Sequence, residues 1–421
     1  MLNRIKIILK DYNLRNKILF VLGVLVLFRI GSSIPIPGVD HARLSAFLSN
    51  NQFFGLLDIF SGGGLSNLSI LMLGVAPYIT ASIIMQLFTM IFPKLKELYQ
   101  EEGEAGRQKF NQYSRLLTVP LGFLQGFGLM TMLQGQGILG QISFLDKFTN
   151  ISIMIAGTMV LLWLGELISE KGIGNGISLI IFGGIVAGLP STIQRALFTF
   201  DPSQIPMYGL FLAIAALIIG GVVVISEAER LVPVSYAKQV RGSRMYGGVS
   251  THIPLKVNQA GVIPIIFAIS ILLFPQMIVN LLAGLNSGTV AVLSGYILAF
   301  LNNSLVYGAL YFVLVFFFTY FYTAVTFDPK MISQNLQKSG AFVPGIRPGQ
   351  PTSDHLAKII TRITLVGALF LGFIAVVPLG IKAVTGISSL AIGGTALLIV
   401  VSVVLETSKQ IEAQVVMKEY E

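Results

Sequence analysis

The sequence predicts an all-α polytopic membrane protein, with ten transmembrane helices in two pseudo-symmetric inverted halves of five. The chain of 421 residues is 54% apolar and only 11% charged, whereas soluble domains carry about 25% charged residues. Apolar runs of membrane-spanning length recur along the chain, and Lys and Arg gather in alternate loops. These observations exclude an ordinary soluble enzyme and, despite the net charge of +9, a disordered or nucleic-acid-binding chain.

Ten apolar runs are long enough to cross a bilayer, which takes about 20 mostly apolar residues. They are residues 18–36, 70–92, 115–133, 151–169, 177–198, 208–226, 260–282, 305–326, 359–379 and 384–405. Two other apolar stretches, 53–68 and 289–301, are shorter. We predict that each is an interfacial or re-entrant segment. The alternative for residues 289–301 is an eleventh membrane span.

The distribution of basic residues predicts that both termini are cytosolic. With ten spans, one side receives both termini and the loops 93–114, 170–176, 227–259 and 327–358. Counting Arg115 and Arg362 at adjoining helix ends, that side holds 23 of the 28 Lys and Arg. The basic, amphipathic start of the chain lacks a following cleavage site, so it is predicted to be a surface-lying helix.

Five spans lie in residues 1–200 and five in residues 201–421, which we take as the two halves. Because five is an odd number, two similar halves would have opposite topology in the membrane. This is the arrangement of inverted repeats. The N-terminal half then holds the surface helix, spans 1 to 5 and the segment 53–68, and the C-terminal half holds spans 6 to 10 and two long loops.

Catalytic and ligand-binding patterns are missing from the sequence. It has no cysteine, no phosphate-binding GxxxxGK[ST] loop and no HExxH zinc helix. We therefore expect no enzymatic activity, no metal site and no cofactor. The charges inside spans are few: Arg29 could snorkel to the outer surface and Glu166 lies near the cytosolic end of the fourth span. Structural roles are favoured over proton-relay roles for both.

The loops 227–259 and 327–358 are about 30 residues long and basic. One interpretation is positive-inside topology with contact to anionic membrane lipid. The other is docking of a large anionic partner. Both loops contain Gly and Pro at intervals, which predicts ordered, protruding turns.

Several long segments resemble the SecY family, the channel subunits of the bacterial protein translocase. They are FRIGSSIPIPGVD (28–40), FSGGGLSNLSILMLGVAPYITASIIMQL (60–87), WLGELISEKGIGNGISLIIFGGIVAGLP (163–190), STHIPLKVNQAGVIPIIF (250–267), NLQKSGAFVPGIRPG (335–349) and GGTALLIVV (393–401). They follow the family's order from the first span to the tenth. The weakest likeness lies in 134–150, 199–208, 283–303 and the tail after residue 405.

This resemblance implies a channel in the bacterial plasma (inner) membrane that conducts unfolded secretory polypeptides. The two halves would hinge at the external loop near 199–207 and open sideways between spans 2–3 and 7–8, releasing transmembrane segments into lipid. Implied partners are the small subunits SecE and SecG, the motor ATPase SecA, the translating ribosome, signal sequences and unfolded preproteins.

The family places a ring of aliphatic side chains at mid-membrane. The matching positions are Val75, Ile79, Ile181, Ile185, Ile266 and Ile399. Such a ring excludes ions by dewetting and does not discriminate among peptides. From their spacing alone these residues read as ordinary core or lipid-facing aliphatics, and the motif matches favour the ring.

The family also places a re-entrant plug helix under the ring. Its residues here are Leu57, Asp58, Ile59, Phe60, Ser61, Gly62, Gly63, Gly64 and Leu65, within the stretch 53–68. A backbone that fails to span must be buried in protein or line a water-filled cavity. An interfacial helix in the outer leaflet is the alternative.

Polar residues mark the predicted side exit and the docking loops. Gln86, Gln125 and Asn258 are isolated amides that would hold the gate closed through interhelical hydrogen bonds, or merely satisfy backbone groups. By resemblance, SecA or the ribosome would bind Lys238, Arg241 and Arg244 in the first loop and Arg347 in the second.

A secondary solute transporter is the alternative function, because many carriers also use inverted repeats. It requires a polar or charged site at the midplane, whereas the middle of these spans is aliphatic. An intramembrane enzyme would need paired catalytic residues inside the spans, and the sequence shows none.

Overall fold

The computed structural model describes most of the chain. The described residues are 11–36, 58, 61–65, 67–135, 137–139, 143–198, 205–236, 239–241, 244–246, 250–283, 295, 300, 303–385 and 388–419. Four predictions fall wholly or largely outside these ranges: the start of the surface helix, the first part of the plug, the hinge loop 199–207 and the stretch 289–301.

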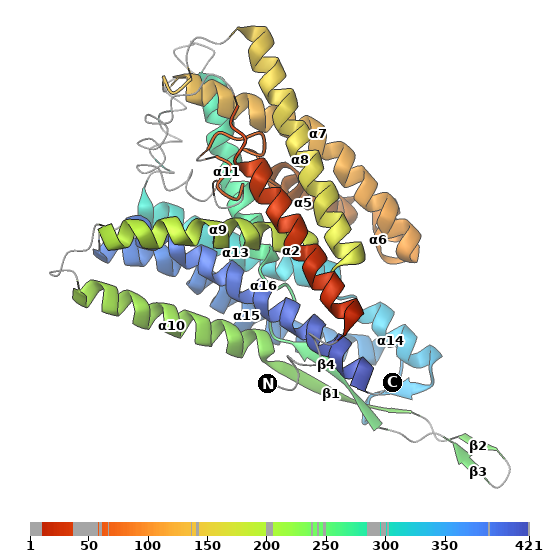
Figure 1. The fold of residues 1–421 in the computed structure, drawn as a ribbon. Coiled ribbons are helices and arrows are strands. Elements are labelled where there is room, and N and C mark those ends of the chain that lie inside the picture. The colour runs from red at the N-terminus through yellow and green to blue at the C-terminus, as the bar shows by residue number, and fades with distance from the viewer. Residues whose placement is uncertain are drawn as a thin grey trace.

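Each of the ten predicted apolar runs overlaps one helix. In the first half these are α2 (Tyr12–Ser32), α5 (Ala76–Ile91), α7 (Gly103–Gly135), α8 (Phe144–Lys171) and α9 (Gly176–Phe198). In the second half they are α10 (Ile205–Glu227), α11 (Ile263–Ala283), α13 (Ser304–Thr326), α15 (Gln350–Thr385) and α16 (Ser388–Glu419). Figure 1 shows α2, α7 and α8 running steeply and α10, α15 and α16 crossing them, with α9 beside α16.

By length and hydropathy, four described helical stretches can cross a membrane on their own. They are Gly103–Gly135, Phe144–Lys171, Leu305–Lys338 and Gln350–Gly380, and α5 with the following short helix is a fifth candidate. Gly176–Pro190, Leu212–Glu227 and Ile263–Leu272 are shorter apolar helices. The chain is therefore a helical membrane protein with several spans, and the count of ten stays a prediction.

The second predicted span is shorter and more sharply ended than expected. Residues 67–75 form turns, so α5 begins only at Ala76. At Phe92 the chain bends by 112° into the short helix α6 (Pro93–Gln100). Pro93 explains the bend, because its ring and missing N–H do not fit a helix interior. The helix α6 then packs back against α7.

Two loops expected to hold only turns contain strands. β1 (Glu229–Tyr236) pairs antiparallel with β4 (Ser250–Lys256) and, at its end, with β5 (Ala341–Phe342). β2 (Gln239–Arg241) and β3 (Arg244–Tyr246) form a separate hairpin. The all-α prediction therefore holds for the bundle and is wrong for these loops.

The sheet has a small core of its own beneath it. Alternate residues of β1, Val232 and Val234, are buried against Leu255 and against Leu356 at the start of α15. The short helix α14 (Pro329–Lys338) contributes Ile332 and Leu336. The loops 227–259 and 327–358 thus fold together as one unit. We call the end of the bundle that carries it the sheet end.

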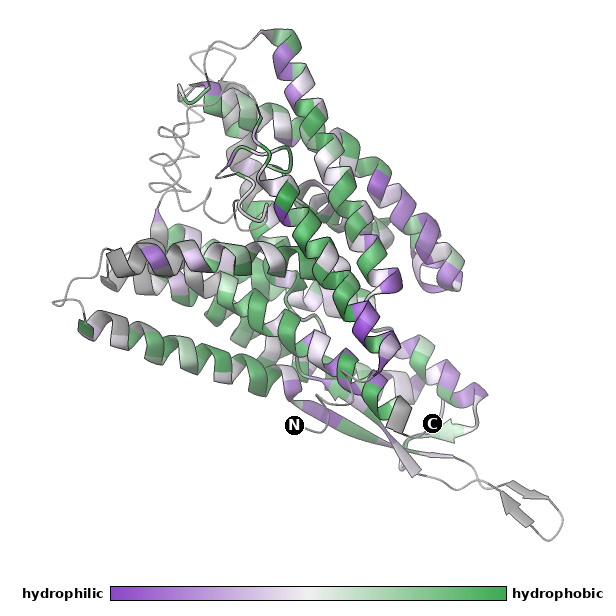
Figure 2. Ribbon diagram, viewed as in Figure 1, coloured by the Kyte–Doolittle hydropathy of each residue, from purple (hydrophilic) through white to green (hydrophobic). Residues whose placement is uncertain are grey.

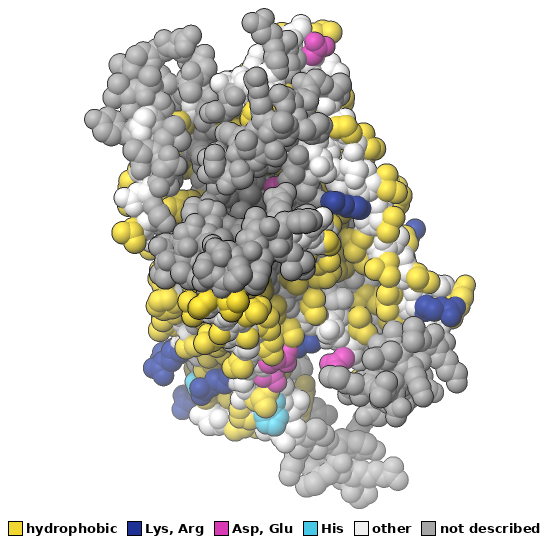
Figure 3. Space-filling model, turned by 60° about the vertical axis from the view of Figure 1, so that its left-hand side comes forward, with side chains coloured by type: hydrophobic (Ala, Val, Ile, Leu, Met, Phe, Trp, Pro, Cys, Tyr) yellow, Lys and Arg dark blue, Asp and Glu magenta, His cyan; other side chains and the backbone are white. Residues whose placement is uncertain are grey.

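The distribution of side chains fits a bundle embedded in a bilayer. Figure 2 shows hydrophobic residues along the helices and hydrophilic ones gathered near α6, α14 and β1. Figure 3 shows a hydrophobic band with His and several Lys and Arg side chains at its lower end, while other Lys and Arg side chains lie higher, on the right of the view. The start of α2 and the last turns of α16 meet at the sheet end, where Leu14, Ile173 and Val415 form a buried cluster. Both ends of the described chain therefore lie on one side, as an even number of crossings requires.

Candidate functional site

The six predicted ring residues lie in one apolar core that joins both halves. Val75 and Ile79 belong to the start of α5, Ile181 and Ile185 to α9, Ile266 to α11 and Ile399 to α16. All six are buried, with exposed fractions from 0% for Val75 to 7% for Ile79 and Ile266. Their helices pack across the boundary between the halves, α5 against α11 and α9 against α16.

The centre of the bundle holds no buried charge among the described residues. Its buried polar side chains are those of Ser, Thr, Gln and Asn. The part of the chain that the structure describes also holds no cluster of His, Asp or Glu fit to bind a metal ion. This arrangement suits a sealed apolar boundary and lacks the charged midplane groups that an ion-coupled carrier would use.

The described part of the plug segment is packed inside the first half. Asp58 and residues 61–65 are described, whereas Leu57, Ile59 and Phe60 lie outside the described residues. Ser61 and Leu65 are fully buried. The backbone N–H of Leu65 donates to Ser61 Oγ at 2.9 Å, and Ser61 Oγ donates to the carbonyl oxygen of Asp58 at 3.0 Å. These bonds close a turn that joins Asp58, Ser61 and Leu65.

Two glycines allow this turn to lie against its neighbours. Gly62 and Gly63 have φ values of +66° and +81°, a backbone conformation that favours glycine. A Cβ atom on Gly62 would overlap the ring of Phe28 in α2 and lie 3.1 Å from the Cα of Gly184 in α9. The triple glycine of the sequence therefore reflects a close approach of backbone to helix at this site.

The sequence suggested that the Arg29 side chain extends to the outer surface, but in the structure it also has a partner in the protein. Its Nη1 donates a hydrogen bond to the carbonyl oxygen of Gly62 at 3.3 Å. The Arg29 side chain thereby links α2 to the turn at residues 58–65. Sequence reasoning placed Arg29 in an apolar stretch, which forms the helix α2, and missed its partner.

The three predicted gate amides belong to α5, α7 and the turn before α11, and their hydrogen bonds among the described residues do not join the two halves. Gln86 Nε2 donates to Ser82 Oγ on its own helix at 3.3 Å. Gln125 Nε2 donates to Thr80 Oγ1 at 3.3 Å, which joins α7 to α5 within the first half. That these two amides hold the seam closed stays a prediction, because the hydrogen bonds they form among the described residues lie within the first half.

Asn258 stabilises the turn before α11, because its Nδ2 donates to the carbonyl oxygen of Gly261 at 3.3 Å. Within the described residues, Gln86 Oε1 and Asn258 Oδ1 are buried without a hydrogen-bond partner. Each such acceptor costs desolvation free energy, about 1–3 kcal/mol. Two unsatisfied acceptors beside the seam make its closed form less stable than an all-apolar contact.

A polar contact between the halves comes from a residue that the sequence did not single out. Gln100 Nε2, at the end of α6, donates to the carbonyl oxygen of Val325 in α13 at 3.1 Å. Its neighbour Tyr99 packs against the central core and against Phe110. The bend at Phe92 is what brings α6 to this position. No local sequence pattern marks Gln100, since its partner lies 225 residues away.

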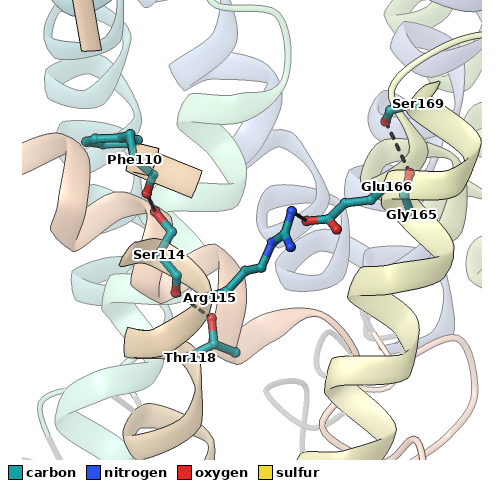
Figure 4. A network of polar contacts seen from close by, with 7 residues as sticks. All are labelled: Phe110, Ser114, Arg115, Thr118, Gly165, Glu166 and Ser169. Atoms are coloured by element: carbon teal, nitrogen blue, oxygen red, sulfur yellow. Dashed lines mark hydrogen bonds and ion pairs between the residues drawn. The ribbon is translucent and has the colours of Figure 1, made fainter. Parts of the chain in front are cut away.

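Glu166 forms an ion pair with Arg115, which agrees with the structural role that the sequence favoured for it. Arg115 Nη2 in α7 lies 2.6 Å from Glu166 Oε1 in α8. Figure 4 shows the two side chains reaching toward each other between the helices, with Ser114 and Thr118 bonded to carbonyl oxygens of α7. The ion pair thereby fixes the spacing of two helices within the first half.

The predicted docking residues belong to the sheet end. Arg241 and Arg244 face each other in the register of the β2–β3 hairpin, which protrudes from the bundle in Figure 1. Lys238 lies outside the described residues. Arg347 is exposed in a turn between Gly345 and Gly349, both at positive φ, and its carbonyl oxygen accepts a hydrogen bond from Thr352 Oγ1 at 2.8 Å. The prediction of ordered turns is confirmed at this site.

Together these features define a polytopic helical membrane protein whose centre is an aliphatic seam between two halves. The chain belongs to the SecY family, whose model matches residues 69–408. It is 43% identical over 436 residues to the protein translocase subunit SecY of Corynebacterium glutamicum, covering 98% of this chain and 97% of that protein. It is 42% identical over 430 residues to the same subunit of Streptomyces scabiei, with the same coverage.

Solved structures share the fold at lower sequence identity. A structure described as that of a protein conducting channel matches with a TM-score of 0.64 and 21% identity, covering 94% of this chain and 91% of that one. Sec61 in a canine ribosome-channel complex matches with a TM-score of 0.60, 20% identity and the same coverage. The resemblance read from the sequence motifs is therefore confirmed for the family and for the fold.

Proposed function

We propose that this chain is the channel-forming subunit of a bacterial protein translocase. It conducts unfolded secretory polypeptides across the plasma membrane and releases transmembrane segments into lipid. The observation that carries the proposal is the burial of six aliphatic residues from four helices in one core shared by both halves. Its relatives in Corynebacterium and Streptomyces are translocase subunits, as their names state.

The ring residues suit a seal that must open for any sequence. Val75, Ile79, Ile181, Ile185, Ile266 and Ile399 are aliphatic and uncharged. A narrow ring of such side chains excludes ions because water is unstable between them. The same side chains make no strong bond to a passing peptide, so they neither select nor retain it.

The side exit lies where α11 meets α5 and α7, which correspond to spans 7, 2 and 3. Contact there is mainly apolar, with unsatisfied amide oxygens on Gln86 and Asn258. An apolar signal sequence can replace such contacts at low cost, which favours lateral release. The stretch 57–65 is the plug that closes the channel on the side away from the sheet.

The sheet end provides the docking surface for the driving partner. Lys238, Arg241, Arg244 and Arg347 would bind acidic groups of the motor ATPase SecA or phosphates of the translating ribosome. Small membrane subunits of the SecE and SecG type complete the complex. This assignment places both termini in the cytosol and the chain in the bacterial inner membrane.

Reconstitution tests this proposal against a secondary solute transporter. The chain is purified with co-expressed SecE- and SecG-type subunits, placed in proteoliposomes and supplied with SecA, ATP and an unfolded preprotein. We expect protease-protected preprotein to accumulate only when both SecA and ATP are present. Absence of protection, together with solute uptake driven by an ion gradient, would favour the carrier.

A further inference from the structure

Arg29 carries a positive charge inside a helix that is otherwise apolar around it. Charged side chains within spanning helices are costly, and they usually serve a specific partner or pathway. The partner here is the backbone of residues 62–63. Arg29 Nη1 donates to the carbonyl oxygen of Gly62 at 3.3 Å, and the same nitrogen would lie 3.3 Å from a Cβ atom on Gly63.

Phe28, the residue of α2 just before Arg29, packs against the same backbone. Phe28 is 2% exposed, and its ring occupies the space where Gly62 would carry a side chain. The Cα atom of Gly184 in α9 lies 3.1 Å from the position that a Cβ atom on Gly62 would take. Residues 61–65 are thus held between α2 and α9 by close packing and by the hydrogen bond from Arg29. The carbonyl oxygens of Gly63 and Gly64 also accept from the backbone N–H groups of Asn67 and Ser69, at 3.3 and 2.8 Å.

The following residues pair with the stretch of chain just after α2. The N–H of Ile36 donates to the carbonyl oxygen of Leu68 at 2.8 Å, and the N–H of Ile70 donates to that of Ile34 at 3.0 Å. Asn67 Nδ2 also donates to the carbonyl oxygen of Ser32 at 3.3 Å. This attachment involves no atom of Arg29.

We propose that Arg29 is a positioning residue that latches the plug in its closed place, while the pairing of 34–36 with 68–70 is the fixed anchor. The inference rests on the proposed function of residues 57–65 as the plug. A single charge-assisted hydrogen bond near the long end of the usual range is strong enough to bias the closed state. It is also weak enough to break when a polypeptide enters.

A cysteine reporter tests the latch directly, because the chain has no cysteine of its own. Ser61 is fully buried beside the latch, so Ser61→Cys reports its release through reaction with a membrane-impermeant thiol reagent. In this background we expect Arg29→Gln to speed labelling on the order of tenfold, the effect of losing one hydrogen bond at the weak end of the range for a charged group. Arg29→Lys retains a cationic donor of similar length and should largely restore slow labelling.

Conductance in planar bilayers distinguishes the latch from the plug assignment. Arg29→Gln should raise the idle ion leak in the full chain and add nothing in a chain lacking residues 57–65. If Arg29→Gln leaves labelling unchanged, or raises the leak equally in both backgrounds, the latch is wrong while the plug stands. If deletion of 57–65 by itself leaves conductance unchanged, the plug assignment fails and the latch fails with it.

Discussion

Gln100 and Val325 join the two halves of the channel, since the Gln100 side-chain amide donates to the Val325 carbonyl oxygen at 3.1 Å. The bond lies where the seam between α5, α7 and α11 reaches the end of α13. The predicted gate amides form local bonds or bonds within the first half instead. Opening of the halves along this seam therefore has to break the Gln100 bond.

We predict that Gln100→Glu favours the open form, because it removes the donor while keeping the size of the side chain. Loss of one hydrogen bond of about 1 kcal/mol corresponds to roughly a fivefold change in the closed-to-open ratio. Export of a precursor with a defective signal sequence should rise by a similar factor. Gln108→Glu, an exposed site on α7, introduces the same charge change and is the matched control. Equal export by both variants would contradict the prediction.

A second prediction concerns the ion pair between Arg115 and Glu166. Glu166→Gln keeps the shape of the side chain but leaves Arg115 without its counter-charge, and Arg115 Nε has no partner among the described residues. Because both side chains are partly exposed, we expect a loss of only about 1–2 kcal/mol, seen as a lower melting temperature of the purified complex. The exchange Arg115→Glu with Glu166→Arg should recover part of that loss. An unchanged melting temperature for Glu166→Gln would show that the pair is dispensable.

The sequence predicted the bundle well because its signal is local. Each apolar run became a helix, and the ring positions, chosen by motif, proved buried. The strand β1 was also readable, since Val232 and Val234 alternate with exposed neighbours at a period of two. The charge and the Gly and Pro content of this loop do not indicate the alternation.

The polar contacts were not predictable in the same way. The partners of Arg29 and Gln100 are carbonyl oxygens 33 and 225 residues away, and every residue has such a group. Their positions depend on a tight glycine turn and on a 112° bend, which only the assembled fold determines. The gate amides Gln86 and Asn258 differ, because their bonds are local. Gln86 and Ser82 are four residues apart on one helix, a spacing at which side chains meet.

We predict that Arg347→Glu impairs motor-driven export without disturbing assembly. Arg347 is exposed on a turn fixed by Gly345 and Gly349, so its side chain can be reversed in charge without loss of packing. SecA-stimulated ATP turnover and preprotein export should both fall several-fold, while the yield of the purified complex stays the same. Lys330→Glu, which is also exposed but lies outside the turn, is the matched control. Unchanged turnover and export in Arg347→Glu would contradict the docking assignment.

We predict that polar substitutions in the aliphatic ring weaken the barrier to ions. Ile79→Asn and Ile181→Asn place an amide where water is otherwise unstable, so ions should follow the water through the idle channel. The closed state should lose about 1–2 kcal/mol, which shifts the population toward the open form and relaxes signal selection. Ile79→Leu retains an aliphatic seal and is the control. Single-channel conductance that is as low in the asparagine variants as in the leucine variant would show that these residues do not form the constriction.

The most direct test of a protein-conducting pore through the ring is crosslinking to a polypeptide stalled in transit. A photoreactive residue is placed at position 79 or 181, both buried in the core between the halves, or at Trp163, which is 59% exposed on α8. A stalled secretory chain should crosslink strongly to positions 79 and 181 and weakly to position 163, which faces lipid in this account. If the chain crosslinks to position 163 as strongly as to the other two, or to none of them, the polypeptide does not pass through the ring and the central claim is wrong.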